Sequence, residues 1–184
     1  MSAAQIRLAR FDEDAALVRT LMREYATFLN ASVGGEHICV DTLEQELAGL
    51  PGPYAEPAGT VLLAFVDDSD SGAATPQPAG CVALKPLHLE DLARAQERAC
   101  EMKRLWVRPA FQRLRIGRQL AEAVLDAARE RGYSAMYLDT MPATMPAAYA
   151  LYCDLGFIPV ARYHRNPVLR EPESASVAFL RRDL

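Results

Sequence analysis

The sequence lacks the features that mark membrane and secreted proteins. No apolar run comes near the roughly 18 residues that a membrane-spanning helix needs. Residues 1–14 contain no basic start followed by an apolar stretch, so we expect no signal peptide and a cytoplasmic protein without a membrane partner.

Clustered metal ligands and clustered positive charge are also missing. None of the four cysteines has a spacing typical of metal ligands, so we expect neither a bound metal nor a disulfide framework. Three of them stand in apolar segments, where a free thiol packs as a small hydrophobic group: Cys81, Cys100 and Cys153. The formal net charge is −4 without a basic run, which disfavours nucleic-acid binding.

The composition that remains is typical of a globular domain. Hydrophobic residues make up 51% and charged residues 24% of the 184 residues. No internal repeat or linker divides the chain, and its length suits one hydrophobic core. We therefore expect a single domain over residues 1–184, present as a monomer or a homodimer.

The apolar periodicity predicts an α/β (α+β) fold, with hairpins first and a strand–helix–strand unit in the second half. The predicted strands are 5–10, 60–66, 80–87, 100–107, 136–140, 157–161 and 176–180. The predicted helices are 12–29 with Asp12 as its cap, 41–48, 116–131 and 147–155, and residues 88–98 form an exposed insertion. Simple alternation along 100–107 places one set of side chains on one face: Glu101, Lys103, Leu105 and Val107.

The segment from Leu105 to Arg118, LWVRPAFQRLRIGR, is the most informative part of the sequence. A strand ends at Val107, Pro109 delays the next helix, and a short loop leads into it. Such a junction presents unpaired backbone N–H groups at the positive end of a helix, which together bind phosphate. Gly117 permits a close approach, and nearby side chains supply donors and positive charge: Gln112, Arg113, Arg115 and Arg118.

The stretch Gln112-Arg113-Leu114-Arg115-Ile116-Gly117 resembles the cofactor signature of the GNAT acetyltransferase superfamily, Gln/Arg-x-x-Gly-x-Gly/Ala. The first glutamine and the last glycine match, whereas Arg115 replaces the middle glycine. If Arg115 adopts a positive φ, the strain costs roughly 1 kcal/mol, which a salt link to phosphate could offset. The later stretch AYALYCDLGF, residues 148–157, resembles the second family motif, Ala-x-x-Leu-Tyr-x-x-Leu-Gly-Phe.

The resemblance implies a GNAT fold and acetyl-CoA as co-substrate. The fold is a central mixed, largely antiparallel sheet of six to seven strands, splayed between the fourth and fifth and flanked by about four helices. The residues implied to contact acetyl-CoA are Leu105, Trp106, Val107, Gln112, Arg113, Leu114, Arg115, Ile116, Gly117, Arg118, Met145 and Tyr152. Backbone groups of Leu105 and Val107 would pair with the pantetheine as a strand does, and Met145 stands where many relatives have an asparagine.

The resemblance also suggests two catalytic side chains. Tyr152 matches the tyrosine that commonly protonates the leaving thiolate, and a phenol with a pKa of about 10 suits that role. Glu101 stands on the fourth strand, where some relatives place a glutamate base. The alternative for Glu101 is a carboxylate paired with Lys103, Arg104 or Lys85, in which case water or His164 would take the amine proton.

The expected function is acetyl-CoA-dependent N-acetylation of a primary amine of a small molecule or amino acid, by direct attack on the thioester. Two alternatives stay open: acetylation of protein lysines or N-termini, and a GNAT-like domain that binds acyl-CoA without catalysis. Residues 28–41 and 163–171 should border the acceptor, but their mixed charge does not identify it.

Overall fold

The computed structural model describes residues 4–32, 40–67, 75–88, 97–163 and 177–184. Their elements in chain order are β1 (Gln5–Leu8), α1 (Phe11–Ser32), α2 (Val40–Ala48), η1 (Gly52–Tyr54), β2 (Thr60–Val66), β3 (Gln77–Leu87), β4 (Ala99–Val107), η3 (Pro109–Phe111), α3 (Ile116–Glu130), β5 (Ala135–Thr140), α4 (Pro146–Asp154), β6 (Ile158–Val160) and β7 (Ala178–Asp183). The predicted strands and helices are confirmed with shifted ends. Most of the predicted insertion, 89–96, and the start of the predicted last strand lie outside the described residues.

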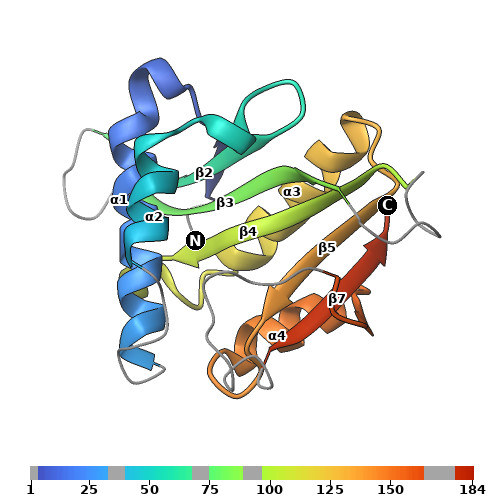
Figure 1. Ribbon diagram of the computed structural model, residues 1–184. Helices are drawn as coiled ribbons and strands as arrows, with labels where there is room; N and C mark the ends of the chain where they lie inside the picture. The colour runs from blue at the N-terminus through green and yellow to red at the C-terminus, as the bar shows by residue number, and fades with distance from the viewer. Residues whose placement is uncertain (1–3, 33–39, 68–74, 89–96, 164–176) are drawn as a thin grey trace.

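The strands form one sheet in the order β1-β2-β3-β4-β5-β7-β6. Adjacent strands of the sheet are antiparallel, except for β4 and β5, which are parallel. These two strands pair only from Ala99↔Ala135 to Glu101↔Tyr137, and beyond that point they diverge (Figure 1). The predicted splay between the fourth and fifth strands is therefore confirmed.

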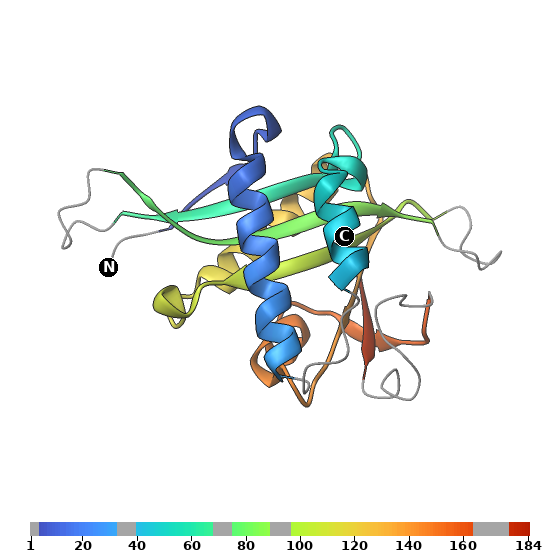
Figure 2. The same cartoon turned by 60° about the vertical axis from the view of Figure 1, so that its left-hand side comes forward.

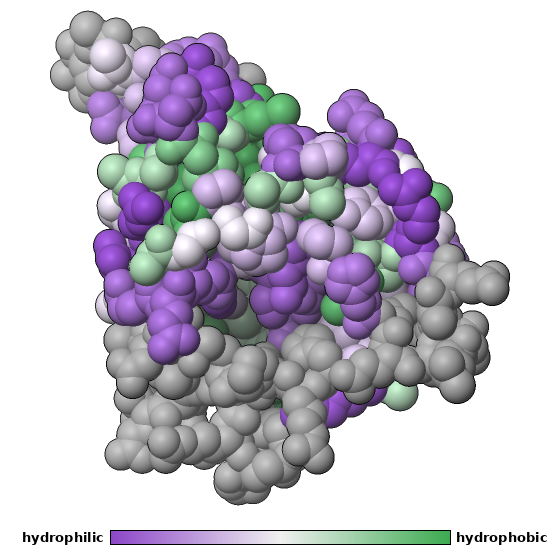
Figure 3. Space-filling model, turned by 45° about the horizontal axis from the view of Figure 1, so that its top comes forward, coloured by the Kyte–Doolittle hydropathy of each residue, from purple (hydrophilic) through white to green (hydrophobic). Residues whose placement is uncertain are grey.

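Helices cover both faces of the sheet. Figure 2 shows α1 lying across the strands with α2 beside it, whereas α3 and α4 lie behind the sheet in Figure 1. The apolar layer under α3 and α4 includes Met102, Leu120, Val124, Leu138 and Tyr152. The layer under α1 and α2 includes Val18, Leu21, Leu47, Leu63 and Trp106. On the face shown in Figure 3, hydrophilic residues occupy much of the edge, and hydrophobic residues gather between them in the upper part.

A β-bulge in β4 overturns the predicted alternation. Cys81 and Ala83 of β3 pair with Trp106 and Lys103, so β4 has an extra residue across this interval. Arg104 absorbs it with a φ of 57°. As a result, Leu105 and Val107 pack against the layer under α3, on the face opposite to Lys103.

The predicted cap of the first helix is also wrong. The helix α1 begins at Phe11, so Asp12 lies within its first turn. The carboxylate of Asp14 instead accepts the N–H of Arg10 at 2.8 Å and pairs with Arg7 at 2.6 Å. The preference for a carboxylate at the helix start holds, but a residue further along the chain satisfies it. None of the described helices is long and apolar enough to cross a membrane.

Candidate active site

The divergence of β4 and β5 creates an opening in the middle of the sheet. Lys103 and Asp139 each lie two residues beyond the last strand pair, Glu101↔Tyr137. Their side chains bridge the opening, with 3.1 Å between Nζ of Lys103 and Oδ1 of Asp139. Burial alone would lower the pKa of Lys103, but the negative charges of Asp139 and Glu101 raise it. The bridging group is therefore an ammonium ion.

The loop before α3 presents the backbone groups that the sequence predicted. The first intrahelical hydrogen bond runs from the N–H of Gln119 to the carbonyl of Arg115, at 3.1 Å. The N–H groups of Ile116, Gly117 and Arg118 precede that bond. Arg115 is the cap residue and forms no side-chain cap hydrogen bond, and the preceding loop is exposed. This helix start can receive an anion.

Arg115 adopts the glycine-like conformation that its place in the motif suggested. Its φ and ψ are 59° and 15°, in the left-handed region, and Arg113 has a φ of 71°. A Cβ added to Gly117 would meet nothing closer than 3.7 Å. The space beside Gly117 is therefore open enough for a small side chain or a ligand atom.

Several other residues of the predicted cofactor set have partners within the protein. The Trp106 side chain packs against α1, with its ring 5.2 Å from that of Phe28 and its N–H donated to Glu24 at 3.2 Å. Trp106 can thus offer only its backbone. Arg118 pairs with Asp154 of α4 at 2.9 Å, and Gln112 donates to the carbonyl of Val107 at 3.3 Å.

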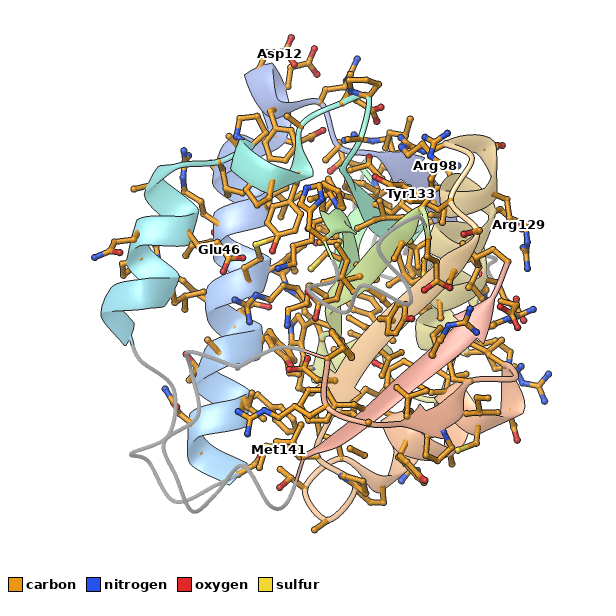
Figure 4. All side chains as sticks on the ribbon, turned by 45° about the vertical axis from the view of Figure 1, so that its right-hand side comes forward. Asp12, Glu46, Arg98, Arg129, Tyr133 and Met141 are labelled. Carbon is orange, nitrogen blue, oxygen red and sulfur yellow. The ribbon has the colours of Figure 1, made fainter. Side chains whose placement is uncertain are left out.

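Met145 and Tyr152 come to the site from α4 and the loop before it. Met145 caps α4 and packs beside Leu29 and Met141. Figure 4 labels Met141 near the end of β5. Tyr152 is 7% exposed, and its ring lies 5.9 Å from Phe157. Burial, with smaller contributions from Tyr25 and the charge of Asp139, raises the pKa of Tyr152, so the phenol keeps its proton at neutral pH.

Glu101 is buried among partners. It is 1% exposed, with Oε2 3.0 Å from Nζ of Lys85 and Oε1 3.5 Å from Nζ of Lys103. The hydroxyl of Tyr163 donates to Oε1 at 2.9 Å. Of the cations that the sequence offered as partners, Lys85 and Lys103 are therefore correct, whereas Arg104 pairs with Glu46 of α2 at 2.6 Å (Figure 4 labels Glu46). His164 lies outside the described residues.

Sequence reasoning missed Asp139, Tyr25 and the pairing of Lys103 with Asp139. Asp139 is the one charged residue of β5, AMYLDT, which was a usable signal. Its proximity to Lys103 depends on β4 lying next to β5, which no local pattern reveals. Most of the predicted acceptor loops, 33–39 and 164–171, lie outside the described residues. No group of three or more potential metal ligands occurs within the described part of the chain.

Comparison with known proteins adds relatives with this architecture. The sequence model of the acetyltransferase (GNAT) family matches residues 36–157. An uncharacterized N-acetyltransferase of Schizosaccharomyces pombe is 30% identical over 167 residues, covering 91% of this chain and 90% of the relative. One from Dictyostelium discoideum is 40% identical over 82 residues, covering 45% and 35% of the two chains.

Solved structures share the fold at low sequence identity. A GNAT-family acetyltransferase from Staphylococcus aureus has a TM-score of 0.70 at 18% identity, with 99% of each chain covered. The PaiA N-acetyltransferase of Thermoplasma acidophilum, solved with coenzyme A, has a TM-score of 0.67 at 16% identity, with 99% of each chain covered. A protein from Salmonella typhimurium, solved with its cofactor acetyl-CoA, has a TM-score of 0.58 at 19% identity, with 99% and 94% covered.

Replacing Arg115 by glycine or by alanine should separate backbone strain from charge. Both variants lose the guanidinium group, but only Arg115→Gly relieves the positive φ. We expect Arg115→Gly to be more stable than Arg115→Ala by about 1 kcal/mol in urea unfolding. Both should bind CoA, the expected ligand, more weakly than the parent by a similar factor in calorimetry. Equal stabilities would contradict the strain at this position.

Proposed function

This chain belongs to the GNAT acetyltransferase family, and from that membership we propose that it transfers an acetyl group from acetyl-CoA to a primary amine of a small molecule or amino acid. The observation that carries the proposal is the position of the open start of α3. One short loop joins it to β4, the strand that diverges from β5. This arrangement offers a phosphate site and a thioester site on one continuous segment. A cytoplasmic location and the oligomeric state stay predictions.

The residues of the segment fit CoA. The edge of β4 that faces β5 has no strand partner from Met102 onward within the described residues. Backbone groups of Leu105 and Val107 can therefore pair with the pantetheine amides. The N–H groups at the start of α3 and the Arg115 guanidinium can hold the pyrophosphate. When bound, acetyl-CoA supplies an activated acetyl thioester.

Tyr152 is suited to hold the proton that a leaving thiolate needs. Its ring projects from α4 into the layer beneath the opening, and its hydroxyl is influenced by the charge of Asp139. Burial in an apolar layer disfavours the phenolate, so this hydroxyl stays protonated throughout the neutral range. The burial also fixes the ring, which favours a defined donor position.

The surroundings of Glu101 favour a structural role over that of a base. Lys85, Lys103 and Tyr163 occupy its two oxygens. A carboxylate whose oxygens are held in this way is poorly placed to accept the proton of the amine. Water at the opening is the more suitable acceptor for the amine proton, as the sequence-based alternative allowed.

Binding of CoA tests the central proposal. We expect micromolar affinity, equivalent to about −8 kcal/mol, in calorimetry. Gly117→Glu should abolish binding, because it places a carboxylate where the pyrophosphate would lie. Gly117→Ala is the matched control, because its Cβ has room and the family signature accepts alanine there. The absence of binding by the parent protein at millimolar CoA would refute the proposal.

Turnover tests the role of Tyr152. CoA release is measured with acetyl-CoA over a panel of primary amines, which also separates an enzyme from a domain that only binds acyl-CoA. Tyr152→Phe should lower kcat by roughly 100-fold or more while the affinity for CoA stays near that of the parent. An unchanged kcat would show that water or another group protonates the thiolate.

The variant Glu101→Gln tests the structural role of the carboxylate. We expect it to lower the free energy of unfolding by about 1–3 kcal/mol, because it leaves two partly buried ammonium groups with a weaker partner. The pH profile of kcat/KM should stay where it is in the parent. A displacement of that profile to higher pH, with unchanged stability, would instead assign the base to Glu101.

A further inference from the structure

The ion pair between Lys103 and Asp139 lies where β4 and β5 diverge. Lys103 is 17% exposed and Asp139 is 12% exposed at the side chain. Burial is the main cause that raises the pKa of Tyr25 in α1 and of Tyr152 in α4. The negative charge of Asp139 makes a smaller contribution in the same direction for both. Asp139 therefore acts electrostatically on side chains of α1 and α4, which cover opposite faces of the sheet.

Lys103 can leave Asp139 without losing its only charged partner. Its ammonium group is also 3.5 Å from Oε1 of Glu101. The difference between 3.1 Å and 3.5 Å shows that Asp139 holds the closer position in this structure. A competing cation at Asp139 would move Lys103 towards Glu101, which is a small displacement between two carboxylates. The cost of uncovering a buried charge is thereby avoided.

A small apolar cluster lies at the end of β5, the strand that carries Asp139. Leu29 and Met141 form a small cluster to which Tyr25 and Met145 contribute. Met141 follows Asp139 by two residues at the end of β5. An alkyl chain on an ammonium group held by Asp139 could pack against this cluster, between α1 and the end of β5.

We propose that Asp139 binds the ammonium group of the acceptor, that this acceptor is a primary alkylamine, and that the acceptor displaces Lys103 from Asp139. The inference rests on the proposed function, because it takes the opening between β4 and β5 to be the acetyl-transfer site. Asp139 thereby selects the acceptor, and Lys103 sets how tightly it is held.

The competition is tested with butylammonium as the probe. NMR titrations measure its Kd for the full chain, with and without saturating CoA, so that the result does not depend on turnover. Asp139→Asn should weaken binding by roughly tenfold or more, the loss expected for one charge-assisted hydrogen bond. Lys103→Met should strengthen binding several-fold, because it removes the competitor. In the double variant, Lys103→Met should give no gain.

Two control variants separate competition from a general change of charge. Arg23→Met removes a cation of α1 that pairs with Glu44 at 2.7 Å, outside the group formed by Lys85, Glu101, Lys103 and Asp139, so the Kd of butylammonium should stay within about twofold of the parent. Lys103→Arg keeps a cation at Asp139, so it should not strengthen binding. Thermal unfolding by circular dichroism shows that each variant is folded, and Lys103→Gln replaces Lys103→Met if the latter is not.

Weaker or unchanged binding in Lys103→Met, or unchanged binding in Asp139→Asn, would overturn the inference. So would the absence of saturable butylammonium binding to Lys103→Met. CoA calorimetry is read separately. A protein that binds CoA but shows the wrong pattern with butylammonium refutes this inference alone, whereas failure to bind CoA refutes the proposed function.

Discussion

The early separation of β4 from β5 is the constraint on which the rest of the site depends. The two strands are parallel and share only the pairs from Ala99↔Ala135 to Glu101↔Tyr137. Beyond them, the backbone groups along one edge of β4 need partners that the sheet does not supply. An extended ligand that pairs with this edge of β4 can supply those partners. Its far end would then lie at the start of α3. The proposed phosphate and thioester sites thus both follow from one local failure of strand pairing.

Backbone strain is concentrated in the same segment. The residues with positive φ that are not glycine, among those the structure describes, are Arg104, Arg113 and Arg115. The first forms the bulge of β4, and the other two shape the loop before α3. Such conformations cost about 1–3 kcal/mol each and persist where the surrounding structure requires them. All three are arginines, so each of these strained backbone positions also carries a positively charged side chain.

The charged side chains around the opening are mostly buried, and they form ion pairs with one another. Lys103 bridges Asp139 and Glu101, Lys85 pairs with Glu101, and Arg104 pairs with Glu46 across to α2. A buried charge without a partner would be strongly unfavourable, whereas a pair is nearly neutral in its effect on stability. Such a network is therefore weak evidence of stabilisation. In the proposed exchange at Asp139, this network would keep Lys103 paired with Glu101.

The sequence by itself determined the family, the order of the elements and the loop before α3. These depend on local signals: apolar periodicity, Pro109, Gly117 and the motif around Tyr152. The faces of β4, the burial of Trp106 and the pairing of Lys103 with Asp139 were decided only by the tertiary structure. The bulge at Arg104 moves the side chains that follow it to the opposite face of β4. The strands β4 and β5 are neighbours in the sheet although α3 separates them in the sequence. A contact between distant strands leaves no local pattern, because each strand is specified by its own neighbours and the partner is chosen only when the sheet assembles.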